Sequence, residues 1–232
     1  MGKPVFIARQ ASYPTGVLGW IVAQIMSRET GWENQRAIDL LDLKPGQAVL
    51  DIGCGHGASL KELARRVEHG RVTGLDPSAV MTGVARKKAR GGAIEIVIEI
   101  IQAAARDMPF EDAAFDAAMS VHTIYFWDDP ILELSEIRRV VTPQGRFVLG
   151  FRSSQDERFV SDSPSAVYHI RSLEEVEALV RSAGWKIDNR VRDRARGALF
   201  HWFVCRPKST AQMREDFRLD AGGAKYAAPK RP

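Results

Sequence analysis

A loop rich in glycine is the feature of this sequence that most directly implies chemistry. Glycines stand at 53, 55 and 57, directly after the apolar run at 48–52, and an apolar repeat with helical spacing begins at Leu60. Such a loop lets the backbone approach a ligand closely and places N–H groups near the start of the next helix. The arrangement predicts a loop that binds a cofactor.

The glycines alone fit two classes of cofactor. Gly53, Gly55 and Ala58 satisfy a relaxed form of the dinucleotide fingerprint. Asp76 follows at about the distance expected of the acid that binds a ribose. Asp51 argues against a dinucleotide cofactor, because a dinucleotide enzyme has no need of a carboxylate so close to a pyrophosphate.

The wider sequence around these residues resembles a known family. The segment VLDIGCGHG at 49–57 resembles the first motif of class I S-adenosylmethionine (SAM)-dependent methyltransferases. In that family an acidic residue two positions before the first glycine helps to hold the methionine amino group, and Asp51 matches it. The segment GLDPS at 74–78 resembles the second motif, whose acid accepts hydrogen bonds from both ribose hydroxyls, and Asp76 matches that acid.

Two further stretches extend the resemblance to roughly residues 8–206. The segment DMPFEDAAFDAAMS at 107–120 looks like the family's path from the adenine edge into strand four, and PQGRFVLGF at 143–151 looks like its fifth strand. The resemblance implies SAM as methyl donor in an enzyme of the bacterial small-molecule type. The cofactor-binding residues expected on this basis are Tyr13, Asp51, Gly53, Cys54, Gly55, Asp76, Pro77, Ala104, Ala105 and Ser120.

The expected adenine site departs from the family pattern. Related sequences commonly carry an aspartate shortly before the acidic-Leu-Pro-Phe stretch, where it binds the adenine amino group. Here the run at 102–106 reads Gln-Ala-Ala-Ala-Arg and offers no carboxylate. Backbone groups near Ala104 and Ala105 are therefore expected to contact the adenine.

The methyl acceptor is expected beyond the carboxyl ends of the strands, where open parallel sheets bind their ligands. Residues 121–127 begin at such an end, and in the family this segment lies beside the sulfonium. His122 is the expected general base, because histidine titrates nearest neutral pH. Alternatively, His122 hydrogen-bonds the loop or the methionine end of the cofactor. Tyr125 is the second candidate catalytic residue, Trp127 would extend an apolar wall, and Phe126 is expected in the core.

The N-terminal segment RQASYPTGVLGW at 9–20 resembles the start of a bacterial methyltransferase subgroup, in which this region folds over the cofactor as a cap. Tyr13 would then touch the methionine carboxylate. A Tyr-Pro pair is also an ordinary turn that opens a helix, so both interpretations remain open.

The elements that position these residues alternate along the chain. Apolar residues at 17–25 and 37–41 predict two helices before the first strand. Strands are expected at 48–52, 72–76, 94–101, 115–120, 146–151, 186–191 and 198–205, with a turn at 143–145. The pattern predicts an α/β, Rossmann-like class I methyltransferase fold: a seven-stranded, mostly parallel sheet with an antiparallel last strand and helices on both faces. The expected division is an N-terminal helical cap (1–44), a SAM-binding domain (45–207) and a flexible tail (208–232).

Charge, cysteine content and hydrophobicity limit the partners, metals and cellular location that are expected. The net charge is +4 and the pI is about 9.2, but basic residues are scattered apart from a knot at 86–90, so no nucleic-acid partner is expected. Two cysteines, Cys54 and Cys205, are too few for a thiolate zinc site or a radical SAM cluster, so no metal is expected. Without a candidate membrane span or signal peptide, the predicted location is cytoplasmic, as a monomer or homodimer.

The sequence thus predicts methyl transfer from SAM to a small molecule, with three alternatives. A methyltransferase of nucleic-acid bases is disfavoured, because the end of strand four reads Ser-Val-His-Thr at 120–123, without an Asn/Asp-Pro-Pro-aromatic motif or a cysteine. Looser RNA or protein methylation is one alternative. A regulatory protein that binds SAM without transferring the methyl group is another, and a nicotinamide dehydrogenase is the third.

Overall fold

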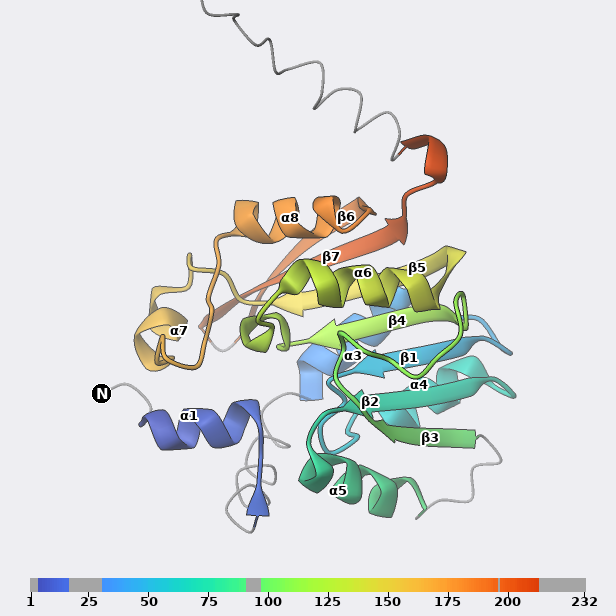
Figure 1. The fold of residues 1–232 in the computed structure, drawn as a ribbon, viewed down its shortest axis with the longest axis horizontal. Helices are drawn as coiled ribbons and strands as arrows, with labels where there is room; N and C mark the ends of the chain where they lie inside the picture. Colours follow the sequence, from blue (N-terminus) through green and yellow to red (C-terminus); the bar gives the residue numbers. More distant parts are fainter. Residues whose placement is uncertain (1–3, 17–30, 91–96, 196, 213–232) are drawn as a thin grey trace, which may run out of the picture.

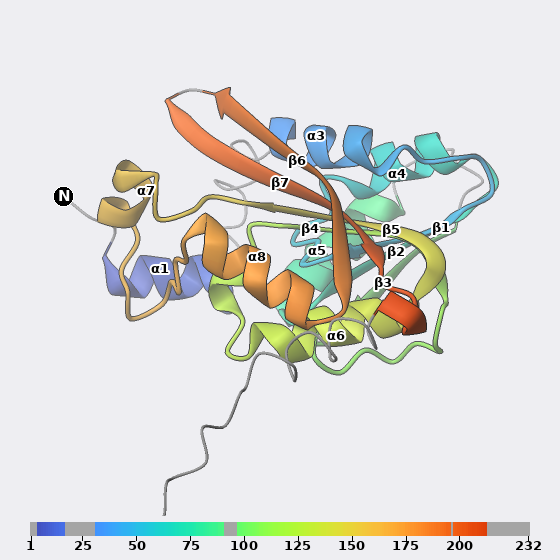
Figure 2. The ribbon, with the colours of Figure 1, turned by 90° about the horizontal axis from the view of Figure 1, so that it is seen from above.

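The computed structural model describes residues 4–16, 31–90, 97–195 and 197–212. One seven-stranded sheet with the strand order β3-β2-β1-β4-β5-β7-β6 lies between helices (Figures 1 and 2). The strands are β1 (Ala48–Ile52), β2 (Arg71–Asp76), β3 (Val97–Gln102), β4 (Phe115–Val121), β5 (Val141–Phe151), β6 (Trp185–Ala195) and β7 (Ala198–Pro207). The helices are α1 (Val5–Ser12), α3 (Gly31–Leu41), α4 (Leu60–Val67), α5 (Ala79–Ala89), the 3-10 turn η1 (Ile124–Phe126), α6 (Pro130–Val140), α7 (Glu157–Asp162) and α8 (Leu173–Ser182).

The strand directions confirm the predicted fold. β1 pairs in parallel with β2 and β4, and parallel pairing continues to β3 on one side and to β5 on the other. β7 runs antiparallel to both of its neighbours, β5 and β6. The chain passes from β3 to β4 across β1, so the strand order reverses between β1 and β4. Open α/β sheets bind their ligands at this point, beyond the carboxyl ends of the strands.

Two apolar cores, one on each face, fix the position of the sheet. On one face α3, α4 and α5 pack with residues such as Ile38 and Leu63, and on the other α6 and α8 pack with residues such as Leu134. Figure 2 shows α3 and α4 on one side of the sheet and α6 and α8 on the other. In β5, Phe147 joins the core of α6 and Val148 joins the core of α3, because successive strand residues face opposite sides.

Helix α3 is a layer of this fold. It packs on β4 and β5, and Ala37, Ile38 and Leu41 are buried there. The cap expected over residues 1–44 and its boundary at 44/45 stay predictions. None of the helices within the described ranges has both the length and the apolar character that a membrane crossing requires.

Several predicted elements need correction or fall outside the description. The turn expected at 143–145 is a bulge within β5: pairing jumps from Phe115–Val141 to Ala117–Arg146, and Gly145 lies so close to β4 that a Cβ would stand 2.8 Å from the Asp116 carbonyl oxygen. The helices α1 and α7 were not predicted. The expected helix at 17–25, the start of the strand at 94–101 and the tail from 213 lie outside the described residues.

Helix α8 begins with a capping box, for which Ser172-Leu-Glu-Glu175 has the typical residue pattern. The Ser172 hydroxyl accepts a hydrogen bond from the Glu175 N–H, and the Glu175 carboxylate accepts one from the Ser172 N–H. We expect Ser172→Ala to lower the free energy of unfolding by about 1 kcal/mol, the usual effect of losing an N-cap. Chemical denaturation of wild type and variant measures this. An equal loss in Ser161→Ala, whose hydroxyl caps no helix start, would contradict the assignment to the cap.

Candidate functional site

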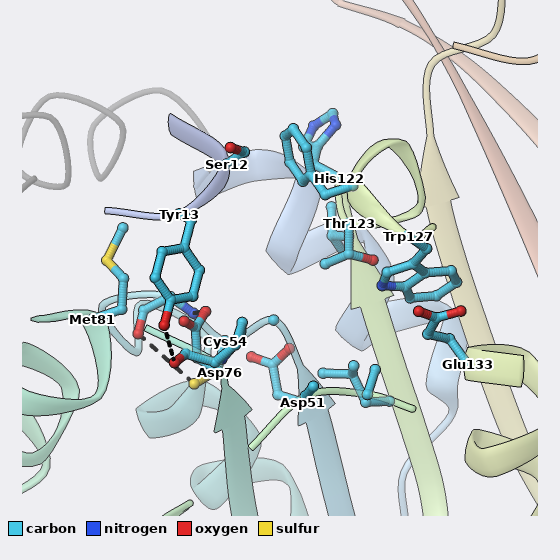
Figure 3. A pocket seen from close by; sticks show the side chains of 18 of the residues that line it. Ser12, Tyr13, Asp51, Cys54, Asp76, Met81, His122, Thr123, Trp127 and Glu133 are labelled. Atoms are coloured by element: carbon cyan, nitrogen blue, oxygen red, sulfur yellow. Dashed lines mark hydrogen bonds between the residues drawn. The ribbon is translucent and has the colours of Figure 1, made fainter. Parts of the chain in front are cut away.

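A cavity of about 440 Å³ lies at the carboxyl ends of β1, β2 and β4 (Figure 3). The last residue of each of these strands lines it: Ile52, Asp76 and Val121. The site therefore occupies the point where the strand order reverses. Its walls also include the glycine loop after β1, the segment after β3 and the segment between β4 and α6.

The glycine loop is tied to the end of β2. The N–H groups of Gly53 and Cys54 both donate to the Leu75 carbonyl, at 2.7 and 3.0 Å, and the Gly55 N–H donates to Asp76 Oδ2 at 3.0 Å. These three N–H groups thus already have partners within the protein, and the expected role of the three residues in binding a cofactor stays a prediction. A pyrophosphate would need such groups, so the geometry disfavours a dinucleotide.

Asp76 is fixed at the end of β2 with its carboxylate at the cavity wall. Oδ2 accepts from the Gly55 N–H and Oδ1 accepts from the Ser78 N–H at 2.9 Å. Burial raises the pKa of Asp76 to about 6, and the two backbone hydrogen bonds oppose that rise. Each carboxylate oxygen can accept more than one hydrogen bond, so Asp76 can also receive two donors from a ligand diol.

Asp51 is the second buried carboxylate of the cavity. Its side chain is 3% exposed, and the Ser59 hydroxyl donates to Oδ2. Burial raises the pKa of Asp51 to about 7; the hydrogen bond from Ser59 opposes this, and the charge of Asp76 adds to it. Because a buried carboxylate is costly to ionise alone, a cationic ligand group at this position would stabilise the charged form.

His122 stands at the cavity wall directly after β4. Its φ of +60° is in the left-handed region, and its N–H donates to the Gly150 carbonyl at 2.9 Å. Its ring nitrogen Nδ1 lies 3.3 Å from the Tyr125 hydroxyl. The backbone thus turns sharply at the end of the strand, and Figure 3 shows His122 above Thr123 at the edge of the site. Its ring also packs edge-on against Phe200.

Tyr125 does not face the acceptor space, which corrects its expected catalytic role. It is 2% exposed and is not among the residues that line the cavity. Its hydroxyl accepts a hydrogen bond from the Arg152 N–H at 2.5 Å, and burial raises its pKa. Phe126, expected in the core, packs against the core and also lines the cavity. The 3-10 turn η1 thus buries Tyr125 and leaves Phe126 partly at the cavity wall.

Comparison with known proteins agrees with this geometry. A SAM-dependent methyltransferase from Aquifex aeolicus superposes with a TM-score of 0.64 at 22% identity, over 75% of this chain and 88% of that one. A family model described as a methyltransferase domain matches residues 50–149. Residues 50–149 thus match a methyltransferase domain, and the fold is that of a SAM-dependent methyltransferase.

Curated methyltransferases match parts of the chain. The 24-methylenesterol C-methyltransferase 2 of Arabidopsis thaliana is 29% identical over 65% of this chain and 41% of that protein. The 2-phytyl-1,4-naphtoquinone methyltransferase of Trichormus variabilis is 35% identical over 54% of this chain and 56% of that protein. The chain thus spans only about half the length of these relatives, or less.

Within this methyltransferase fold, Ser120 is part of the packed structure. It does not make the contact with a ligand that was expected of it. It is fully buried, and its hydroxyl donates to the Ile52 carbonyl at 3.0 Å. The Thr123 hydroxyl lies 2.5 Å from Ser120 Oγ, and it is Thr123 that lines the cavity. The left-handed turn at His122 brings Thr123 back over the end of the strand.

Tyr13 lines the cavity, as expected. Its hydroxyl donates to the Pro77 carbonyl at 3.2 Å, and the Ser78 hydroxyl donates to the Pro14 carbonyl at 2.6 Å. The end of α1 is thereby attached to the start of α5, beside Asp76. The contact of Tyr13 with the methionine carboxylate stays a prediction.

The remaining predicted residues line the cavity together, and others join them. Gly53, Cys54, Pro77, Ala104 and Ala105 all lie in its wall. Trp127, expected in the apolar wall, lines the cavity as well. The lining residues that sequence reasoning did not assign include Ser12, Asn34, His56, Met81, Arg106, Asp128 and Glu133. Met81 follows Ser78 by one helical turn, which could have suggested it. Within the described ranges, no group of three His, Cys, Asp or Glu side chains is arranged to hold a metal ion.

The raised pKa values of Asp51 (about 7) and Asp76 (about 6) predict opposite pH effects on folding and on binding. Both values lie above the unfolded value, so the folded apo protein holds extra protons. This stabilisation is complete below about pH 4 and is lost as pH rises through 6 to 7. A ligand that donates to the carboxylates needs their ionised forms. We therefore expect the affinity for S-adenosylhomocysteine (SAH) to rise about a hundredfold from pH 5.5 to 7.5.

Calorimetric titration of SAH and denaturation of the apo protein across this pH range measure the two slopes. In Asp51→Asn, which cannot ionise at this position, the part of both slopes near pH 7 should disappear. If both pH slopes stay unchanged in this variant, groups other than Asp51 cause the pH dependence.

Proposed function

We propose that this protein binds SAM in the cavity and transfers its methyl group to a small molecule, with release of SAH. The observation that carries the proposal is the convergence of two buried carboxylates, Asp51 and Asp76, on one cavity at the ends of adjacent strands. They supply acceptors for the ammonium group and for the ribose hydroxyls of SAM. Residues 45–207 form the SAM-binding domain in this proposal, and the segment around α1 covers it.

SAM supplies an already activated methyl group, so the protein mainly has to align the reactants and exclude water. Proximity and orientation can supply about 7–11 kcal/mol of barrier reduction in favourable cases. His122 lies at the end of β4 beside the acceptor space and takes a proton where the acceptor must lose one. The Tyr125 hydroxyl at 3.3 Å from Nδ1 positions the imidazole. An acceptor that reacts as an anion needs no base.

The wall beside His122 favours a largely apolar acceptor. Val121, Phe126 and Trp127 line this part of the cavity. The names of the curated relatives fit such an acceptor, since they include sterol, phytyl-naphthoquinone and fatty-acid methyltransferases. Between β5 and α8 the described chain holds only the six-residue helix α7, which leaves little room for an insertion that binds a macromolecule.

The test is a transfer assay with radiolabelled SAM and a panel of reduced naphthoquinones, fatty acids and phenols, with SAH release as the second readout. We expect label in the organic phase and SAH in equal amounts. In His122→Asn, turnover of a protonated acceptor should fall while SAH affinity stays. SAH binding without transfer to any acceptor would favour a regulatory SAM-binding protein. Protection against heat by NADH and not by SAH would contradict the proposal altogether.

A further inference from the structure

Glu133 places a buried carboxylate at the acceptor end of the cavity, the end walled by Phe126 and Trp127. It lies in the first turn of α6, lines the cavity and is 5% exposed. Figure 3 shows its carboxylate below the Trp127 ring, with Asp51 between it and Asp76. The sheet order agrees, since β1 with Asp51 lies between β2 with Asp76 and β4, which leads into α6.

One oxygen of this carboxylate has no partner in the part of the chain that the structure describes. Oε2 of Glu133 is buried and accepts no hydrogen bond there. Nearly all buried polar atoms in folded proteins are hydrogen-bonded, and an unsatisfied one destabilises the protein. Burial raises the pKa of Glu133, as do the charges of Asp129 and Asp128, while Arg106 opposes the rise. A ligand group that donates an O–H or N–H to Oε2 would therefore be stabilising.

The methyl acceptor is the ligand that remains to supply this donor. In the proposed function the ammonium group and the ribose of SAM are assigned to Asp51 and Asp76, and its adenine to the segment after β3. The wall next to Glu133, with Trp127 in it, is the one assigned to the acceptor. The reacting group of the acceptor is assigned to His122, so the group at Glu133 is a second polar group of the same molecule.

We propose that Glu133 binds a hydroxyl or amino group of the methyl acceptor and so selects an apolar acceptor that carries a second hydrogen-bond donor. The assignment rests on the proposed function, because it takes the occupant of this end of the cavity to be the acceptor. An ether oxygen in place of the donor has no proton to give. Its lone pairs would face those of Oε2, and both atoms would stay unsatisfied.

The experiment measures the binding of probe acceptors to the SAH-bound protein by calorimetry. The probes are dihydroxynaphthalenes and aminonaphthols, each compared with the methoxynaphthol of the same substitution pattern. Wild type should bind a diol or an amino compound about ten- to a hundredfold more tightly than its methoxy partner, the usual effect of a hydrogen bond to a charged group. A preference among the diols identifies the donor as a hydroxyl, and one among the amines as an amino group.

Two variants and a matched control assign the preference to Glu133. Glu133→Leu removes both acceptor oxygens, so diol or amine and methoxy probe should bind equally. In Glu133→Gln the amide keeps an oxygen that accepts and adds an N–H that can donate to the ether, so the preference should fall at least about threefold. Glu111→Leu makes the same change at an exposed position and should keep the wild-type preference.

The stability of the apo protein separates this role from a structural one. Because Oε2 has no partner among the described residues, both Glu133 variants should leave the thermal midpoint unchanged or raise it. The proposal is overturned if wild type binds SAH but prefers no donor probe, or if the preference is unchanged in the Glu133 variants. If wild type binds no SAH, the proposed function fails first, and this inference fails with it.

Discussion

Replacing Asp76 by alanine is expected to weaken SAH binding by about two to three orders of magnitude. The carboxylate is held by the Gly55 and Ser78 N–H groups, and in the proposed function it accepts two further hydrogen bonds from the ribose. Hydrogen bonds to a charged group contribute about 1.5–3 kcal/mol each, and every 1.4 kcal/mol changes the dissociation constant tenfold. Calorimetric titration with SAH measures the loss.

Two controls separate binding from folding in this experiment. Asp76→Ala leaves the Gly55 and Ser78 N–H groups without their acceptor, so the thermal midpoint of each apo protein must be compared first. Asp107→Ala removes the same charge at an exposed position and should bind SAH like wild type. A folded Asp76→Ala protein with wild-type affinity for SAH would place the ribose elsewhere, and the proposed function would lose its main support.

The central βαβ unit could be predicted almost to the residue because its signals are local. β1 covers 48–52 as expected, and α4 begins at Leu60, where the apolar repeat begins. In both elements the period of the apolar residues matches the geometry of the element. The carboxylates at 51 and 76 were predictable for the same reason: each lies at or next to the end of a strand, and parallel strands end at one edge of the sheet.

The short helices were not predictable, since distant contacts stabilise them. In α1, Ala8 is buried, whereas Val5 and Phe6 are exposed, so the sequence carries no helical stripe. Helix α7 has no buried residue, and its N-cap Asp156 also accepts hydrogen bonds from Arg152 and Leu199. Such helices form where the tertiary structure supplies partners, which is information that a local window does not contain.

On the acceptor side of the site, too, the local sequence did not predict which side chains face the cavity. A left-handed residue, His122, followed at once by a 3-10 turn changes which side chains face the cavity. Neither the strand period nor the helix period applies across that segment, so the sequence did not show that Tyr125 is buried and that Phe126 reaches the cavity. Glu133 was missed for another reason: its helix carries no motif, and its contact with the cavity depends on how α6 packs.

Replacing Gly53 by alanine is expected to lower the free energy of unfolding by about 2–5 kcal/mol and to abolish SAH binding at the working temperature. Gly53 has a φ of +73°, where an L side chain costs about 1–2 kcal/mol. The added Cβ would also stand 2.3 Å from the Cγ2 atom of Thr123. Overpacking of this kind costs about 1–3 kcal/mol, because backbone must move to relieve it. Urea denaturation of the apo proteins measures the change.

A second substitution separates the two costs. Thr123→Ser removes the methyl group that the new Cβ would meet and keeps the hydroxyl beside Ser120. In the double variant the steric cost should largely vanish while the backbone cost at position 53 remains, so the double-mutant cycle should give a favourable coupling of about 1–2 kcal/mol. By contrast, Gly55 has a φ of +54°, and an added Cβ would meet no atom within 4 Å. Gly55→Ala should therefore show the backbone cost alone. It should show no coupling to Thr123→Ser. Equal losses at 53 and 55, with no coupling at either, would mean that the close approach of the loop to Thr123 does not constrain the site.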